Sequence, residues 1–283
     1  MQSIGKESIR MRYMILMIVT DLDGTLLAGG NNIPEKNIEA LRRAMELGAQ
    51  VVLCSGRMIE ATIPIAEAVE ANAPMVLFNG AMVYDRENDR ILSGHTIPKE
   101  TAVQVLREIE AMGAYVQAFP GRGYFYEAET EWTRYYSGKI SVQGQAVGMK
   151  LSHWLETDVY KLLVIGPAGE LDAMQEKLTP MFPDVCFVKS CDRHLEIVAN
   201  GVDKATGLRE LTTISGIGPG EMLGFGDEAN DLPLLHYVGH AHVMENAPEN
   251  VRREIRRMAP KNTEAGLAKI VNQYIDEGKL GRS

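Results

Sequence analysis

Short hydrophobic runs alternate with helical patterns in the first third of the chain. Residues 14–20 form a continuous hydrophobic run, which is typical of a parallel strand covered on both faces. Residues 34–47 follow a helical pattern that ends before Gly48, and residues 50–54 and 74–78 are two further hydrophobic runs. The order strand, helix, strand, helix, strand predicts a parallel sheet with right-handed crossovers.

The pattern changes near Asp85 and stays different until about Ser190. This segment holds both tryptophans, Trp132 and Trp154, and its short strand candidates are mixed with helices. The strand candidates are residues 115–119, 123–127 and 160–165, and the helix candidates are residues 100–112 and 169–178. We expect residues 85–190 to form an inserted α+β domain.

The first pattern returns from Asp192 onward. It contains a strand-like run at 194–198, a helix at 204–215 with Leu208, Leu211 and Ile214 on one side, a strand at 222–225, and a tail helix from Thr263 with the hydrophobic stripe Leu267, Ile270, Val271 and Tyr274. We therefore expect one sheet domain built from residues 14–84 and 191–283 around the insertion. Residues 1–13 show neither pattern and are interpreted as a loose leader.

Length and charge narrow the class of protein. A chain of 283 residues can bury one large core or two modest ones. The net charge of -9 argues against a broad nucleic-acid surface, because such surfaces cluster Lys and Arg. The one basic run, 252–257, is spaced like a solvated helix face rather than a polyanion site. The run 14–20 is too short to cross a bilayer, so no membrane partner is expected.

The three cysteines, Cys54, Cys186 and Cys191, form no C-x-x-C pair. Unpaired thiols are typical of a reducing compartment, so we expect the protein to be cytoplasmic. The sequence does not indicate an oligomeric state.

The strongest chemical signal follows the first strand, in the segment Val19 to Leu27. Asp21 and Asp23 fall at the carboxyl end of this strand, where ligands bind in open parallel sheets. Two neighbouring carboxylates repel each other unless a proton or a cation relieves them, and Mg2+ prefers such oxygen ligands. The spacing suggests Asp21 as a nucleophile and Asp23 as a proton shuttle. Taken alone, the segment also fits a simple turn that caps the next element.

Two weaker signals follow later strands. Ser55 and Gly56 supply a hydroxyl and an unhindered amide that could hold a phosphate, although a helix N-cap is an equally good interpretation. Lys204 begins a predicted helix, where its charge could neutralise a phosphoryl oxygen and a neighbouring aspartate. A lone lysine is otherwise usually solvated.

A fourth signal follows the strand at 222–225. Asp227 and Asp231 are four residues apart and can converge if a helical turn begins there, which would give a cation further carboxylates. Asn230 would then be free to donate to a phosphate. Helix capping is the alternative, but the pattern G-D-x-x-N-D is more specific than a cap.

These four segments in this order resemble the haloacid dehalogenase superfamily of phosphatases. The insertion between the second and third segments resembles its Cof-type branch, which carries a C2-type cap domain there. The resemblance covers almost the whole chain after about residue 14. It implies an α/β fold with a Rossmann-like parallel sheet core and an inserted α+β cap domain.

The resemblance also implies roles for individual residues. It makes Asp21 the phosphoryl-accepting nucleophile and an Mg2+ ligand, and Asp23 the acid/base that also binds the metal through its carbonyl. The phosphoryl group would be held by Leu22, Ser55, Gly56, Lys204 and Asn230. Asp227 would be a further metal ligand, and Asp231 would support the metal shell or Lys204. The implied activity is Mg-dependent hydrolysis of a small phosphorylated metabolite through an aspartyl-phosphate.

The chain departs from the family pattern at two places. Ala205 follows Lys204 where glycine is frequent, which should be tolerated. In the stretch 240–246, near the end of the resemblance, Glu245 stands where the family usually has glycine, which puts the local backbone in doubt. In the same stretch His240 and His242 alternate like one face of a strand, and packing or surface exposure is favoured over metal binding because Mg2+ prefers oxygen.

The substrate and two rival functions stay open. The insertion contains a cluster that could grip a sugar or a second phosphate, or could be ordinary core with solvated arginines: Arg122, Tyr124, Tyr126, Trp132 and Arg134. A phosphomutase would use the same aspartyl-phosphate but return the group to a sugar. A catalytically idle regulatory module would keep the fold without turnover.

Overall fold

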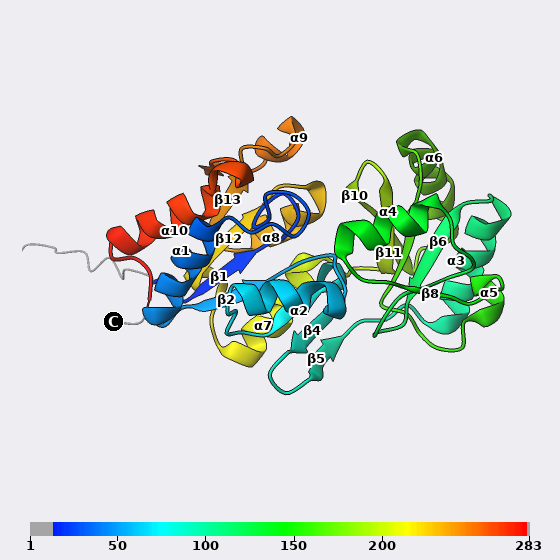
Figure 1. Ribbon diagram of the computed structural model, residues 1–283, viewed down its shortest axis with the longest axis horizontal. Coiled ribbons are helices and arrows are strands. Elements are labelled where there is room, and N and C mark those ends of the chain that lie inside the picture. The colour runs from blue at the N-terminus through cyan, green and yellow to red at the C-terminus, as the bar shows by residue number, and fades with distance from the viewer. Residues whose placement is uncertain (1–13, 282–283) are drawn as a thin grey trace, which may run out of the picture.

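The computed structural model describes residues 14–281 and shows two lobes (Figure 1). The expected leader, residues 1–13, lies outside the described residues. One lobe contains the N-terminal and C-terminal segments, and the other is built from the middle of the chain. This arrangement agrees with an α/β fold interrupted by an insertion.

The first lobe is formed by two separate stretches of the chain. The N-terminal stretch contains β1 (Met17–Thr20), α1 (Glu35–Glu46), β2 (Gln50–Leu53), α2 (Ile59–Ala68), β3 (Met75–Leu77), η1 (Phe78–Gly80), β4 (Met82–Asp85) and β5 (Arg90–Gly94). The C-terminal stretch contains α7 (Lys204–Ser215), η3 (Pro219–Glu221), β12 (Met222–Gly226), η4 (Ala229–Asp231), α8 (Leu232–Tyr237), β13 (His240–Met244), α9 (Glu249–Arg252), β14 (Met258–Ala259), η5 (Asn262–Glu264) and α10 (Gly266–Asp276).

The central sheet of this lobe is parallel throughout, in the order β14-β13-β12-β1-β2. The chain runs outward from β1 to β2, leaves for the second lobe, and returns on the other side of β1 at β12. The strand order therefore reverses between β1 and β12. In open α/β sheets the crevice at such a switch point, beyond the carboxyl ends of the strands, is the usual ligand site.

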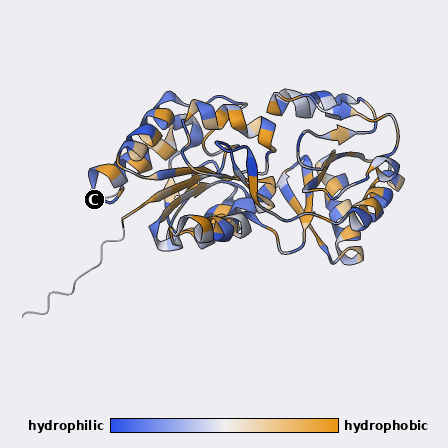
Figure 2. Ribbon diagram, turned by 90° about the horizontal axis from the view of Figure 1, so that it is seen from below, coloured by the Kyte–Doolittle hydropathy of each residue, from blue (hydrophilic) through white to orange (hydrophobic). Residues whose placement is uncertain are grey.

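Helices cover both faces of this sheet. On one face Ile18 lies in a hydrophobic cluster with Leu41 of α1 and Leu267 of α10, whereas Val19 lies in another cluster with Leu208 of α7. Successive strand residues alternate between the two faces, which is why a strand buried on both sides is a continuous hydrophobic run. Figure 2 shows these strands as a largely hydrophobic layer between helices of mixed character.

The third expected strand of the parallel sheet is shorter than predicted and has a second partner. β3 continues the parallel arrangement only through the bridge between Cys54 and Val76, and its full pairing is antiparallel with β4. β3, β4 and β5 thus form a small three-stranded sheet beside β2. The antiparallel return was not predicted because the run at 82–85 is too short to show alternation.

The second lobe is an α+β unit around a six-stranded sheet in the order β10-β11-β9-β6-β7-β8. Its elements are α3 (Lys99–Ala111), β6 (Tyr115–Phe119), β7 (Phe125–Tyr126), α4 (Glu131–Ile140), β8 (Gln145–Ala146), α5 (Leu151–Trp154), β9 (Lys161–Ile165), α6 (Ala168–Leu178), η2 (Thr179–Met181), β10 (Val185–Cys191) and β11 (His194–Ala199). The predicted helices and strands of the insertion all appear, with small shifts of their ends.

Sheet membership differs from the expected boundaries at 85 and 190. β5 pairs with β4 of the first lobe, and β11 pairs with β9 and β10 of the second. The run 194–198 was assigned to the first lobe because a buried hydrophobic strand looks the same in either sheet. We propose that the insertion extends from about residue 95 to about residue 200.

Burial tests two smaller expectations. The stripe of the tail helix is buried as predicted, but Ile214 of α7 is 49% exposed. The arginines at 252–257 are exposed as expected, although α9 ends at Arg252 and they do not share one helix.

In residues 14–281 no helix combines the length and apolar character that a membrane span requires.

Candidate active site

Asp21 lies at the switch point of the parallel sheet. It follows β1 directly, and its backbone N–H donates to the carbonyl of Phe225 in β12 at 3.0 Å. The side chain is buried, with 6% of its surface exposed. The pairing of β1 with β12 therefore brings Asp21 beside the segment that begins at Asp227.

Lys204 joins two of the expected carboxylates. It is the first residue of α7, where Asp203 caps the helix by accepting from the N–H of Thr206. Its Nζ lies 2.6 Å from Oδ1 of Asp21 and also donates to Oδ1 of Asp231. The lysine is 1% exposed, so this is a buried ion-pair network rather than a solvated surface charge.

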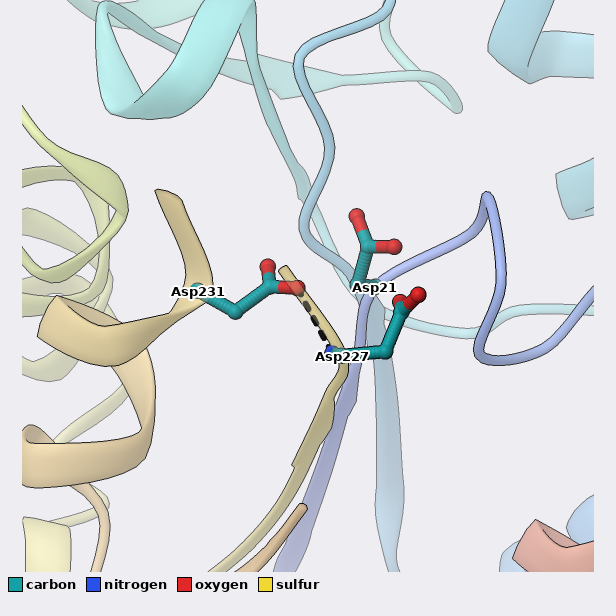
Figure 3. Close-up of side chains that lie close together, drawn as sticks. All are labelled: Asp21, Asp227 and Asp231. Atoms are coloured by element: carbon teal, nitrogen blue, oxygen red, sulfur yellow. Dashed lines mark hydrogen bonds between the residues drawn. The ribbon is translucent and has the colours of Figure 1, made fainter. Parts of the chain in front are cut away.

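Asp227 and Asp231 converge as their spacing predicted (Figure 3). One carboxylate oxygen each of Asp21, Asp227 and Asp231 lies within 4.8 Å of the others. Asp231 is held by the turn itself, because its Oδ2 accepts from the backbone N–H groups of Asp227 at 2.8 Å and Glu228 at 3.0 Å. Thr25 donates to Oδ1 of Asp227 at 2.7 Å.

The charges of this cluster are strongly coupled. Burial, together with the charge of Asp231, raises the pKa of Asp21 to about 7, although Lys204 opposes the change. Burial, followed by the charges of Asp21 and Asp231, raises the pKa of Asp227 to about 9. Burial alone would lower the pKa of Lys204, but Asp21 and Asp231 outweigh it and keep that pKa well above its ordinary value. If all three carboxyls were ionised, they would carry more negative charge than one lysine neutralises, and the raised pKa values reflect this.

Asp23 faces the same pocket but has a different partner. The Nε and Nη2 atoms of Arg57 donate to its two oxygens at 2.8 and 2.7 Å, a bidentate pair. Burial would raise the pKa of Asp23, but the hydrogen bonds and charge of Arg57 lower it below its ordinary value. In this arrangement Asp23 is an ionised carboxylate.

Ser55, Gly56 and Asn230 line the pocket, as expected for groups that hold a phosphate. Ser55 and Gly56 precede α2 by a short loop rather than beginning it, so the N-cap interpretation of Ser55 is wrong. Asn79 connects them, since its N–H donates to the carbonyl of Ser55 at 3.1 Å and its Oδ1 accepts from Nδ2 of Asn230 at 3.0 Å.

Two strands of the second lobe reach the loop of Ser55 and Gly56. Nζ of Lys161 in β9 donates to the carbonyl of Gly56 at 2.7 Å and lies 3.1 Å from Oε2 of Glu196 in β11. Glu196 also accepts from Nδ2 of Asn79 at 2.7 Å. Both charged side chains are buried. We call these four residues, Gly56, Asn79, Lys161 and Glu196, the interlobe network.

Some expected residues take no direct part in the pocket. Leu22 is buried in the hydrophobic core, so only its backbone could reach a phosphoryl group. His242 is buried and its ring stacks on Phe225, in agreement with packing. None of the five residues considered for substrate binding lines the pocket: Arg122, Tyr124, Tyr126, Trp132 and Arg134. Tyr124 and Tyr126 are buried in the core, and Arg122 forms an ion pair with Asp89.

Sequence reasoning missed several residues of the site. Arg57 adjoins Ser55 and Gly56, and Asn79 follows a strand end, so position gave a usable signal for both. Lys161 and Glu196 lie inside strands of the second lobe. A charged residue in a strand is normally expected to face solvent, so neither residue was considered for the site. Only the docking of the two lobes reveals them.

The chain belongs to the haloacid dehalogenase-like hydrolase family, whose sequence profile it matches over residues 18–271. The family predicted from the four segments is thereby confirmed. The protein is an enzyme of the hydrolase class.

Relatives match the chain over nearly its whole length. It is 26% identical to a 5-amino-6-(5-phospho-D-ribitylamino)uracil phosphatase of Bacillus subtilis, over 91% of this chain and 97% of the relative. It is 22% identical to a pyridoxal phosphate phosphatase of Escherichia coli, over 92% and 98%. The crystal structure of a Thermotoga maritima protein matches with a TM-score of 0.79 and 30% identity, over 92% and 97%.

Proposed function

We propose that the enzyme is a Mg2+-dependent phosphomonoester hydrolase that transfers the phosphoryl group of a small metabolite to Asp21 and then to water. The observation that carries the proposal is the meeting of Asp21, Lys204 and Asp227, from three distant segments, in one buried cluster beside the pocket that Asp21 lines. The family and the named activities of full-length relatives support it.

The residues fit a divalent cation. Burial and the charges of neighbouring aspartates raise the pKa values of Asp21 and Asp227, and a hard cation would relieve this by binding the ionised carboxylates. Asp231 is less suited as a ligand because both of its oxygens already accept hydrogen bonds, so we assign it to holding Lys204 and the turn. Asp21, Asp227 and the carbonyl of Asp23 would hold Mg2+. When bound, the ion would offset the charge of the carboxylates and of the phosphoryl oxygens.

In the first step a carboxylate oxygen of Asp21 attacks phosphorus in line with the leaving group. The new bond joins this oxygen to phosphorus, and the bond from phosphorus to the leaving oxygen breaks. Asp23 gives a proton to that oxygen, which requires it to be released from Arg57 and protonated. Lys204 balances the charge beside Asp21 throughout.

In the second step water attacks phosphorus and Asp23 takes its proton. The bond between the Asp21 oxygen and phosphorus breaks, which restores the carboxylate and releases inorganic phosphate. The backbone of Leu22 and Gly56, the hydroxyl of Ser55 and the amide of Asn230 hold the phosphoryl oxygens during both steps.

The relatives named above act on a phosphorylated ribitylamino-uracil and on pyridoxal phosphate, so a small phosphorylated metabolite is the substrate class that we propose. We also propose a cytoplasmic location, which is supported by the free thiols of Cys54, Cys186 and Cys191.

Phosphate release from a panel of phosphorylated metabolites, with and without Mg2+, tests this function. We expect release only with the metal, and loss of release in Asp21→Asn with little change in folding, because the amide has nearly the same shape but is a poor nucleophile. Phosphate-dependent isomerisation without release would instead identify a phosphomutase. An inactive but metal-binding wild-type enzyme would identify a regulatory module.

A further inference from the structure

One basic side chain of the pocket has no acidic partner. The ion pairs described above use Arg57, Lys161 and Lys204. Lys139 of α4 lines the same pocket, and within residues 14–281 its ammonium forms neither an ion pair nor a hydrogen bond. It is only partly buried, so its ammonium can meet a ligand in the pocket.

A second unpartnered group lies on the same wall of the pocket. His194 of β11 is 4% exposed, and its Nε2 has no hydrogen-bond partner among the described residues. The rings of Tyr135 and Tyr136 meet the imidazole edge-on at 5.8 and 5.9 Å and fix its orientation. A buried nitrogen without a partner destabilises a protein unless a ligand or water satisfies it.

The surroundings of His194 determine the protonation of its ring. Burial, together with the positive charge of Lys139, lowers its pKa to about 3, so the ring is neutral at physiological pH. A neutral imidazole carries its proton on one nitrogen, and Nε2 can therefore donate to an anionic oxygen. Lys139 and His194 together offer two donors from the second lobe to a pocket that Asp21 and Asp23 line from the first lobe.

The opposing charge at this wall is Glu228. It lines the pocket from the first lobe and is partly buried, and its carboxylate lies close enough to Lys139 to feel its charge. Attraction between Lys139 and Glu228 across the lobes is thus the competing explanation for the position of the lysine.

The pocket is small in this position of the two lobes. Its volume is about 50 Å³. Since one water molecule needs roughly 10 to 15 Å³ on this measure, the space admits only a compact ligand beside the carboxylates. A phosphoryl group with a short leaving group matches this space, whereas a longer one requires the lobes to separate.

We propose that the enzyme prefers phosphomonoesters whose short leaving group carries an anionic group, held by the ammonium of Lys139 and Nε2 of His194. This inference rests on the phosphatase activity proposed above and adds the chemical class of the leaving group.

The test compares three phosphate esters of similar size, those of glycolate, ethylene glycol and ethanolamine, whose free ends are anionic, neutral and cationic. With Mg2+ present, we expect kcat/KM to be about tenfold higher for the glycolate ester than for the ethylene glycol ester, because a charge-assisted hydrogen bond is of that strength. The ethanolamine ester should be the poorest.

Two variants and one control assign the preference. Lys139→Met and His194→Phe should each lower the ratio of kcat/KM for the glycolate ester to that for the ethylene glycol ester. Arg134→Met is the matched control, because Arg134 is an exposed cation on the same helix that does not line the pocket, and it should leave the ratio unchanged.

Hydrolysis of all three esters at similar kcat/KM would overturn this inference and leave the phosphatase intact. An equal loss for all three esters in Lys139→Met would also overturn it, since the lysine would then serve closure against Glu228. Failure to hydrolyse any of them, while other phosphorylated metabolites are hydrolysed with Mg2+, would overturn the inference alone. Failure to release phosphate from any metabolite would overturn the proposed function as well.

Discussion

Gly24 sets the position of Asp227. Its φ is +85°, and a Cβ atom there would lie 2.0 Å from Oδ2 of Asp227. We expect Gly24→Ala to lose most of its activity, because both the backbone strain and the clash move the turn after β1 away from Asp227, the proposed metal ligand.

Gly29→Ala is the control for strain alone. Gly29 has a φ of +116°, but a Cβ atom there would meet nothing within 4 Å. Both variants should lose roughly 1 kcal/mol or more of stability in thermal unfolding, since alanine is strained at such φ values. Only Gly24→Ala should lose activity and Mg2+ affinity, and equal activity in the two variants would contradict the assigned role of Asp227.

The raised pKa values of Asp21 and Asp227 predict how pH affects stability. The folded state keeps protons on these carboxyls up to about pH 7 and about pH 9, whereas the unfolded chain releases them near its ordinary value of 3.8. The folded state binds more protons over this window, so these groups make the metal-free enzyme less stable as pH rises through it.

Magnesium should reverse this effect, because it binds the ionised carboxylates and competes with protons. We expect the rise in Tm caused by Mg2+ to be larger at about pH 8 than at about pH 6, and to be strongly reduced in Asp227→Asn at both. A rise in Tm that is independent of pH would argue against these carboxylates as the ligands.

Individual site residues could be predicted where a strand end and a short motif coincide. Asp21, Lys204, Asp227 and Asp231 converge as the sequence indicated. Arg57 was missed because its partner, Asp23, lies 34 positions away, and nothing local shows that the guanidinium turns toward it.

At the scale of elements, the buried pair of Lys161 and Glu196 links β9 and β11 to the loop that contains Gly56. Removing one partner leaves a buried charge unpaired and costs about 3 to 5 kcal/mol. We therefore expect Glu196→Gln to lower Tm and to raise KM more than it lowers kcat, since Gly56 and Asn79 lose their support. The double variant Lys161→Met, Glu196→Gln should recover part of the lost stability.

The exposed pair of Lys150 and Glu127 is the matched control. Each side chain is 47% exposed, so Glu127→Gln should change stability by less than about 1 kcal/mol and leave KM unchanged. A Glu196→Gln enzyme with unaltered KM would show that the interlobe network stabilises the fold without positioning the loop.

Elements with strong periodicity could be predicted from the sequence, as α1 and α10 show. Sheet membership could not. The strand at 194–199 is hydrophobic and buried in the second lobe, and local pattern does not distinguish this from a strand of the parallel sheet. Pairing partners are set by tertiary packing.

At the scale of the whole molecule, the two lobes meet over one pocket. The first lobe supplies Asp21, Asp23 and Ser55, and the second supplies Lys139 and His194. The insertion itself was visible as a change of pattern near Asp85. The way the insertion docks on the first lobe could not be predicted. Lys161 and Gly56, which form a hydrogen bond between the lobes, are 105 positions apart, and their contact depends on the orientation of the lobes.

The most direct measurement is to trap the covalent intermediate on the enzyme. Wild-type enzyme turning over a phosphomonoester with Mg2+ is quenched in acid, digested and examined by mass spectrometry. The account predicts a phosphoryl group on the peptide that contains Asp21, and none in Asp21→Asn. Phosphate release by Asp21→Asn at the wild-type rate, or a phosphoryl group on another residue, would contradict it.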